Sequence, residues 1–119
     1  MTSHRGDVVL LDYPFSDSTG SKVRPALVVQ NDRDNVRLTN TVVVLITRNL
    51  SRVSREPTQL LIDITTPEGQ RSGLRANSAV NCSHLFTVHE RHLIHTIGRL
   101  DDGPMRQVDQ CLKVALDLS

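Results

Sequence analysis

Short apolar runs, rich in Val, Ile and Leu and separated by polar segments with glycine or proline, recur along most of the chain. Runs of this length and composition predict β-strands. The run at 41–47, TVVVLIT, shows no alternation of polar and apolar positions, so we expect it at the centre of a sheet with both faces buried. The run at 78–88 is expected to break near Ser83–His84. The expected strands are Val8–Leu11, Pro25–Gln30, Thr41–Thr47, Thr58–Ile64, Ser78–Val88 and His92–Ile97.

The spacing of apolar residues changes near the C-terminus, where they recur every three or four positions and predict one amphipathic helix. Asp102 is the expected N-cap, and Pro104 falls in the first turn. The apolar stripe consists of Met105, Val108, Cys111, Leu112, Ala115 and Leu116. The segments expected to be loops are Phe15–Lys22, Asn31–Asn40, Arg48–Pro57 and Thr65–Gly73.

Several short strands followed by one helix predict a single domain over residues 1–119. The expected fold is mainly β with a C-terminal α-helix. Its sheet should be small, antiparallel and strongly bent, or form a partly open barrel. Such a fold does not by itself indicate a function.

Arginine dominates the positive charge of the chain. There are 14 basic residues, and all except Lys22 and Lys113 are arginines, whose planar guanidinium group suits phosphate and carboxylate recognition. The formal net charge is only +1, but residues 35–99 hold eight arginines against four acidic residues. This basic middle is compatible with a surface for nucleic acid or another polyanion, and also with ordinary solvated side chains.

The sequence contains no apolar N-terminal run of the signal-peptide kind, and no run approaches the about 20 residues of a membrane span. Cys82 and Cys111 lie far apart and match no zinc or redox spacing, so we expect them to be small core residues. These features favour a cytoplasmic protein with reduced thiols and no membrane contact.

Motifs of familiar catalytic chemistry are sparse. The P-loop, the dinucleotide-binding fingerprint and the nucleophile elbow are absent from the sequence. His89, His92 and His95 recur at every third position, but in extended chain this spacing alternates between faces, so no metal site is expected.

The remaining candidate chemistry lies at strand ends. If the strands at 25–30 and 41–47 pair antiparallel, Arg24 at the start of one converges with Thr47 at the end of the other. An arginine and a hydroxyl group between two basic loops would suit a phosphodiester. The alternative is a structural role, in which Arg24 pairs with a nearby carboxylate such as Asp12.

Five segments carry a resemblance to a known family. In chain order they are RGDVVLLDYPF, GSKVRPALVVQND, TVVVLIT, SGLRANSAVNCSHLFTV and LIHTIGRLDD, and the amphipathic helix follows them. Together they cover nearly the whole chain and resemble the MazF/PemK toxin endoribonucleases of type II toxin–antitoxin systems. The resemblance implies an SH3-like small barrel of the MazF/Kid/CcdB type and a homodimer.

The same resemblance implies an enzyme that needs neither metal nor other cofactor and cuts single-stranded RNA, often mRNA, at short sequences. The 2′-OH of the RNA would attack the adjacent phosphorus and leave a cyclic phosphate and a 5′-OH end. The resemblance also implies a cognate antitoxin whose C-terminal segment covers the RNA groove.

In the family, an arginine in an RP motif and a threonine that ends the central strand carry catalysis, and these positions correspond to Arg24 and Thr47. Arginine stays protonated at ordinary pH, so the general base is left open between His84, a water molecule and no well-defined group. The residues expected to bind RNA are Ser21, Lys22, Arg48, Asn49, Asn81, Ser83 and His84, the last three as candidate base readers.

Some family members carry an arginine and an aspartate where this chain has Asn81-Cys82-Ser83, so a mechanism built on that pair is not expected here. Two alternatives stay open: an inactive member that binds without cutting, and a gyrase-inhibitor-type toxin that acts by protein–protein contact. The presence of Arg24 and Thr47 argues against the first, and the tryptophan-free ending VALDLS argues against the second.

Overall fold

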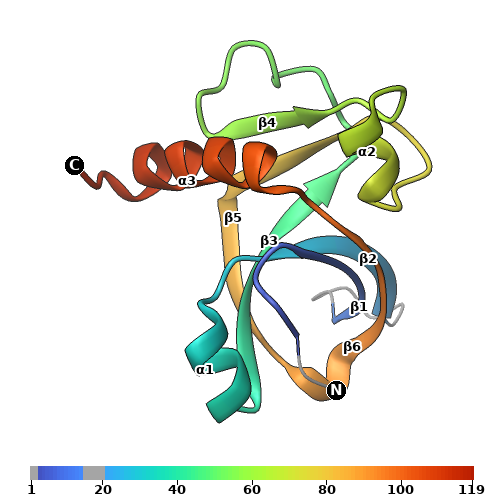
Figure 1. Cartoon of the computed structure of the whole chain (residues 1–119), viewed down its shortest axis with the longest axis vertical. Helices are drawn as coiled ribbons and strands as arrows, with labels where there is room; N and C mark the ends of the chain where they lie inside the picture. Colours follow the sequence, from blue (N-terminus) through green and yellow to red (C-terminus); the bar gives the residue numbers. More distant parts are fainter. Residues whose placement is uncertain (1–2, 15–20) are drawn as a thin grey trace.

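The computed structural model describes residues 3–14 and 21–119, and within them the strands form one six-stranded antiparallel sheet (Figure 1). The order across the sheet is β4-β5-β3-β2-β1-β6, so the sheet is open between β4 and β6. The strands are β1 (Asp7–Pro14), β2 (Ser21–Val28), β3 (Asn40–Thr47), β4 (Gln59–Ile62), β5 (Ser78–His89) and β6 (Leu93–Arg99). The expected mainly-β fold with a bent, partly open sheet is confirmed.

Strand β3 lies inside the sheet between β2 and β5, as its unbroken apolar run predicts. Val43, Val44 and Ile46 are buried from opposite sides of this strand, because they belong to two separate core clusters. The first cluster lies between the sheet and the C-terminal helix α3 (Asp102–Leu116), which packs against β4 and β5. The second lies inside the curled end formed by β1, β2, β3 and β6 (Figure 1).

Strand β5 is interrupted where the sequence predicts a break. Val44 of β3 pairs with Leu85, but the next residue, Leu45, pairs with Asn81. The three residues between them have no partner on β3, and the backbone N–H of Cys82 donates instead to the carbonyl of Thr58, at 2.9 Å. A bulge of this kind bends the strand and lets one sheet serve both core clusters.

Two segments expected to be loops contain short helices. Residues 31–40 include α1 (Asp32–Arg37), and residues 65–73 include α2 (Pro67–Arg71). Each begins at a side-chain N-cap: Asn31 Oδ1 accepts from the N–H of Asp34 at 2.8 Å, and Thr66 Oγ1 accepts from the N–H of Gly69 at 3.0 Å. Helices of under two turns carry too few apolar positions to show a period, so only their caps mark them.

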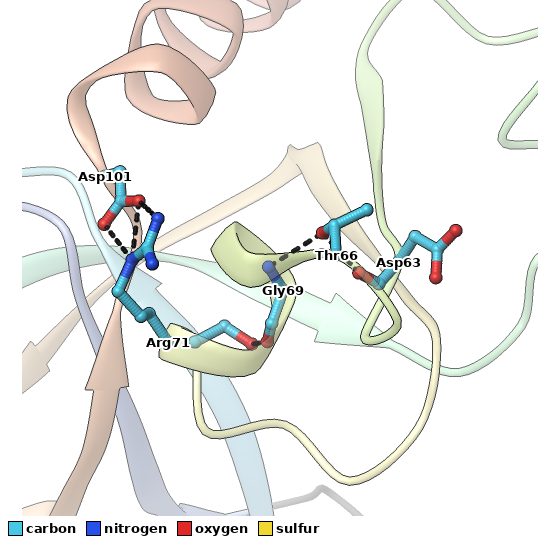
Figure 2. Close-up of polar contacts among 6 residues, drawn as sticks. Asp63, Thr66, Gly69, Arg71 and Asp101 are labelled. Atoms are coloured by element: carbon cyan, nitrogen blue, oxygen red, sulfur yellow. Dashed lines mark hydrogen bonds and ion pairs between the residues drawn. The ribbon is translucent and has the colours of Figure 1, made fainter.

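The N-cap of helix α3 lies one residue earlier than predicted. The N-cap is Asp101 rather than Asp102, and its side chain makes no capping hydrogen bond. The Asp101 carboxylate is held instead by the guanidinium of Arg71, whose Nε donates to Oδ2 at 2.8 Å (Figure 2). This ion pair joins the end of α2 to the start of α3. Strand β6 also begins later than predicted, because Glu90–His92 form a 3₁₀ turn.

The segment that follows α2 packs directly on β6 through glycine. Gly73 has φ +74°, and a Cβ atom built on it would lie 2.0 Å from the carbonyl oxygen of Ile97. A Cβ on Gly98 would lie 2.4 Å from the carbonyl oxygen of Arg71. The two backbones therefore touch where only glycine fits, and this contact places residues 73–78 beside β6.

Within the described residues, no helix is both long enough and apolar enough to cross a membrane.

Candidate functional site

An open groove of about 900 Å³ lies where the ends of β2 and β3 meet β6 and the 73–78 segment. Val23, Arg24 and Pro25 line it from β2, and the end of β3 contributes 45–47 together with Arg48. The remaining lining residues are Leu10 of β1, His95 and Ile97 of β6, and Gly73, Leu74, Arg75, Ala76 and Ser78.

The pairing of β2 with β3 brings Arg24 and Thr47 together. The ladder pairs Ala26 with Leu45, and Arg24 and Thr47 each lie two residues beyond this last pair on their strands. Both residues line the groove, Arg24 as an exposed side chain and Thr47 as a half-buried one. The predicted convergence of these two strand ends is confirmed.

The structural alternative for Arg24 was a pairing with a nearby carboxylate, for which Asp12 was the example. In the β1–β2 register Asp12 lies opposite Val23, whereas Arg24 lies opposite Leu11. Successive side chains of a strand point to opposite faces, so Asp12 and Arg24 belong to different faces of the sheet. The register therefore excludes Asp12 as the partner of Arg24 on one face of the sheet.

The hydroxyl group of Thr47 is oriented by the turn that follows β3. Its Oγ1 accepts a hydrogen bond from the backbone N–H of Asn49 at 3.1 Å. A hydroxyl that accepts one bond keeps its own hydrogen as a donor, which can be directed at an anionic oxygen. The next residue, Arg48, is exposed and lines the same groove.

The groove is cationic. Among the described lining residues, the ionisable groups are Arg24, Arg48, Arg75 and His95, and none is a carboxylate. Three guanidinium groups around one cavity create a positive potential that suits a phosphate backbone. Sequence reasoning did not select Arg75 as a site residue and considered His95 only as a metal ligand. Both residues reach the groove through tertiary packing, and the basic character of residues 35–99 was the one available signal.

The candidate base readers lie elsewhere, at the break in β5. Asn81 Oδ1 accepts from the N–H of Ser83 at 3.1 Å, and His84 Nε2 lies 3.0 Å from the hydroxyl of Tyr13. The Tyr13 ring stacks on Phe86, with centroids 5.1 Å apart and planes at 20°. Asn81, Ser83 and His84 are thus grouped with one another, and the groove lining includes none of them.

The other predicted RNA contacts are scattered around these two places. Lys22 is exposed on β2 opposite Tyr13, and Asn49 is exposed with its Oδ1 accepting from the N–H of Ser51 at 3.1 Å. Ser21 begins β2, but its side chain lies outside what the structure describes, and most of the Phe15–Lys22 loop lies outside the described residues.

Neither cysteine belongs to the groove. Cys82 and Cys111 are free and buried in the first core cluster, as the sequence predicts. Burial raises the pKa of the Cys82 thiol to about 12, and the adjacent Cys111 adds to this shift. Within the described residues, no three side chains of the metal-ligating types gather into one place.

Comparison with known proteins gives a consistent result. Residues 4–116 match the family described as PemK-like, MazF-like toxin of type II toxin–antitoxin system. The chain is 32% identical over 120 residues to endoribonuclease MazF9 of Mycobacterium tuberculosis, covering 96% of each chain. It is 33% identical over 119 residues to endoribonuclease EndoA of Bacillus subtilis, covering 99% of this chain and 97% of the relative.

Solved structures agree in fold. A mycobacterial endoribonuclease solved in complex with its cognate antitoxin has a TM-score of 0.77 at 21% identity, over 98% of this chain and 97% of that one. The MazE–MazF complex of Deinococcus radiodurans contains a chain with a TM-score of 0.73 at 18% identity, over 100% of both chains. The family match spans nearly the whole chain and both core clusters, so this protein belongs to the PemK-like, MazF-like toxins of type II toxin–antitoxin systems.

Proposed function

We propose that this chain is a sequence-specific, metal-independent endoribonuclease toxin that cuts single-stranded RNA in the groove lined by Arg24 and Thr47. The observation that carries the proposal is the antiparallel pairing of β2 with β3, which brings a guanidinium-bearing residue and a hydroxyl into one open cationic groove. The family, and the endoribonuclease names of two relatives aligned over nearly the whole chain, support this class of reaction.

RNA supplies the nucleophile in this reaction, so the protein needs none of its own. The 2′-OH attacks the adjacent phosphorus, the bond from phosphorus to the 5′-oxygen breaks, and the products are a cyclic phosphate and a 5′-OH end. The protein must hold the phosphate in line and stabilise the charge that develops on its oxygens.

Arg24 and Thr47 match those two requirements. The guanidinium of Arg24 can donate two parallel hydrogen bonds to the non-bridging phosphate oxygens. The hydroxyl of Thr47 accepts from the Asn49 N–H, which leaves its hydrogen to donate to the same phosphate. Arg48 and Arg75 line the same groove and can supply charge for the neighbouring phosphates.

We propose that residues at the break in β5 recognise the bases of the RNA. Asn81, Ser83 and His84 present polar groups that suit the edges of unstacked bases, and Tyr13 and Phe86 stack beside them. An aromatic surface that stacks a base contributes about 1–3 kcal/mol. Lys22, opposite Tyr13, would contact the backbone between the groove and this cluster.

The expected partners follow from the same surface. We propose that a cognate antitoxin neutralises the protein by laying its C-terminal segment in the RNA groove. Relatives of the same fold have been solved with their antitoxins. We also propose a homodimer, for which the exposed Ile94 of β6 offers apolar surface outside the groove lining. Because the substrate is RNA, we place the activity in the cytoplasm.

The test is cleavage of a long, mixed-sequence RNA by the purified protein in EDTA, followed by mapping of the new ends. Cuts at one short sequence with 5′-OH ends are the expected result. Arg24→Ala should lower the rate by about 10²–10³-fold, because a charge-stabilising donor is lost. Arg106→Ala, which removes an exposed arginine of α3 outside the groove, is the matched control and should cut normally.

Thr47 allows a sharper comparison. Thr47→Ser keeps the hydroxyl and should cut, whereas Thr47→Val keeps the shape and should not. Equal rates for the two variants would remove Thr47 from the mechanism. A wild-type protein that binds RNA without cutting it would instead indicate an inactive member of the family.

A further inference from the structure

Among the described residues that line the groove, one side chain is of a type that takes up a proton near neutral pH. Its arginines stay protonated at any ordinary pH, so none of them can act as a general base. The described lining includes no carboxylate, and imidazole is the side chain whose charge ordinarily changes near neutrality. His95, exposed in the groove wall on β6, is that group.

The pairing of β6 with β1 is irregular on both sides of His95. Val8 pairs with Gly98 but Val9 pairs with Thr96, and Leu10 pairs with His95 but Leu11 pairs with Leu93. Ile97 on one side and Ile94 on the other are therefore left without a partner on β1. Bulges re-aim side chains and occur often beside active sites. Here two of them frame the only histidine among the described residues of the groove lining.

The sequence-based candidate for the base, His84, is placed differently. Its Nε2 lies 3.0 Å from the hydroxyl of Tyr13, and its ring packs beside Phe86 with centroids 5.6 Å apart. It does not line the groove that holds Arg24 and Thr47. His84 therefore belongs with base recognition rather than with the reacting phosphate.

From these observations we propose that His95 is the general base of the cleavage reaction, an inference that rests on the proposed function. The neutral imidazole of His95 takes the proton of the attacking 2′-OH as the bond from the 2′-oxygen to phosphorus forms. The bond from phosphorus to the 5′-oxygen then breaks, and the departing oxygen takes a proton from water. The imidazolium returns its proton to solvent, so the protein is unchanged after each cut.

The charged groups that share the groove with His95 come from three other segments. Arg24 of β2, Arg48 after β3 and Arg75 of the 73–78 segment line the same cavity. The nearest acidic residue on the paired strand is Asp12, two residues beyond Leu10, and it lies outside the lining. Among the described residues that line this cavity, the charged side chains that accompany His95 are therefore all arginines.

The test is single-turnover cleavage of a short RNA with one cut site, measured across about pH 5 to 8. The wild-type rate should rise with pH and then level off. His95→Gln should be slower by about 10²-fold or more and should lose the rising limb, and added imidazole should restore part of the rate. His92→Gln, which changes a histidine of the 3₁₀ turn outside the groove, is the control and should keep the wild-type profile.

A second substrate distinguishes a general-base role of His95 from a general-acid role. When sulfur replaces the bridging 5′-oxygen, the leaving group needs no proton, so a missing acid is compensated and a missing base is not. His95→Gln should stay slow on this substrate, and recovery of its rate would overturn the role as base. Wild-type kinetics in His95→Gln, with unchanged pH profile, would also overturn it. Failure of the wild type to cut, or normal cutting by Arg24→Ala, would refute the proposed function itself.

Discussion

Replacing Gly73 by alanine tests the contact on which one wall of the groove rests. The residue has φ +74°, and its added Cβ would lie 2.0 Å from the backbone oxygen of Ile97. Left-handed backbone costs an L-residue about 1–2 kcal/mol, and overpacking costs about 1–3 kcal/mol. The obstacle is the backbone of β6, which cannot move aside as a side chain could. We therefore expect the backbone cost and the overpacking cost together, a loss of about 2–5 kcal/mol in the free energy of unfolding.

Substitutions at two other glycines distinguish the cost of the left-handed backbone from the steric cost. Gly69→Ala would place a Cβ 1.9 Å from the carbonyl oxygen of Asp63, at a residue outside the left-handed region, so it should show the steric cost alone. Gly103→Ala meets nothing within 4 Å in the first turn of α3 and should stabilise the protein by about 0.5–1 kcal/mol. All three are compared by urea unfolding followed by circular dichroism, at one protein concentration because a dimer is expected.

The same variant has a consequence for catalysis. Gly73 is two residues from Arg75, and both line the groove. Displacement of this segment should slow RNA cleavage at temperatures where Gly73→Ala is still folded, while Gly103→Ala cuts normally. If Gly73→Ala proved as stable and as active as Gly103→Ala, the backbone contact with β6 would not be setting the groove.

Three further predictions concern single side chains. Cys82 should resist alkylation at pH 8 until the protein is unfolded, because burial raises its thiol pKa to about 12; rapid labelling of the native protein, measured by mass spectrometry, would contradict this. The hydrogen bond from Arg71 lowers the pKa of Asp101 below its ordinary 3.8, so the ion pair stabilises the fold above that pH and the effect disappears as the pH falls through the lowered pKa. Asp101→Asn should therefore be less stable than wild type at neutral pH and equal to it in acid, as followed by thermal unfolding. His84→Gln should alter which sequences are cut more than how fast they are cut, and unchanged cut sites in mapped RNA would remove it from base recognition.

The sequence by itself determined the sheet, its central strand and the helix that closes the chain. Buried strands and an amphipathic helix must carry apolar residues at fixed spacings. Local patterns in the sequence are therefore enough to identify these elements. The run TVVVLIT lies inside the sheet, and the break near Ser83–His84 is present as a bulge. The convergence of Arg24 with Thr47 was also foreseeable, since it needs only one antiparallel pairing of adjacent strands.

Tertiary structure alone decided which other residues share the groove. Arg75 reaches it because Gly73 lets the chain touch β6, and His95 reaches it on a strand framed by two bulges. No local pattern encodes either event, because each depends on the register between segments distant in the sequence. The same holds for His84, whose place beside Tyr13, away from the groove, follows from the bend in β5. Local periodicity therefore specifies the elements, and long-range pairing specifies which side chains meet.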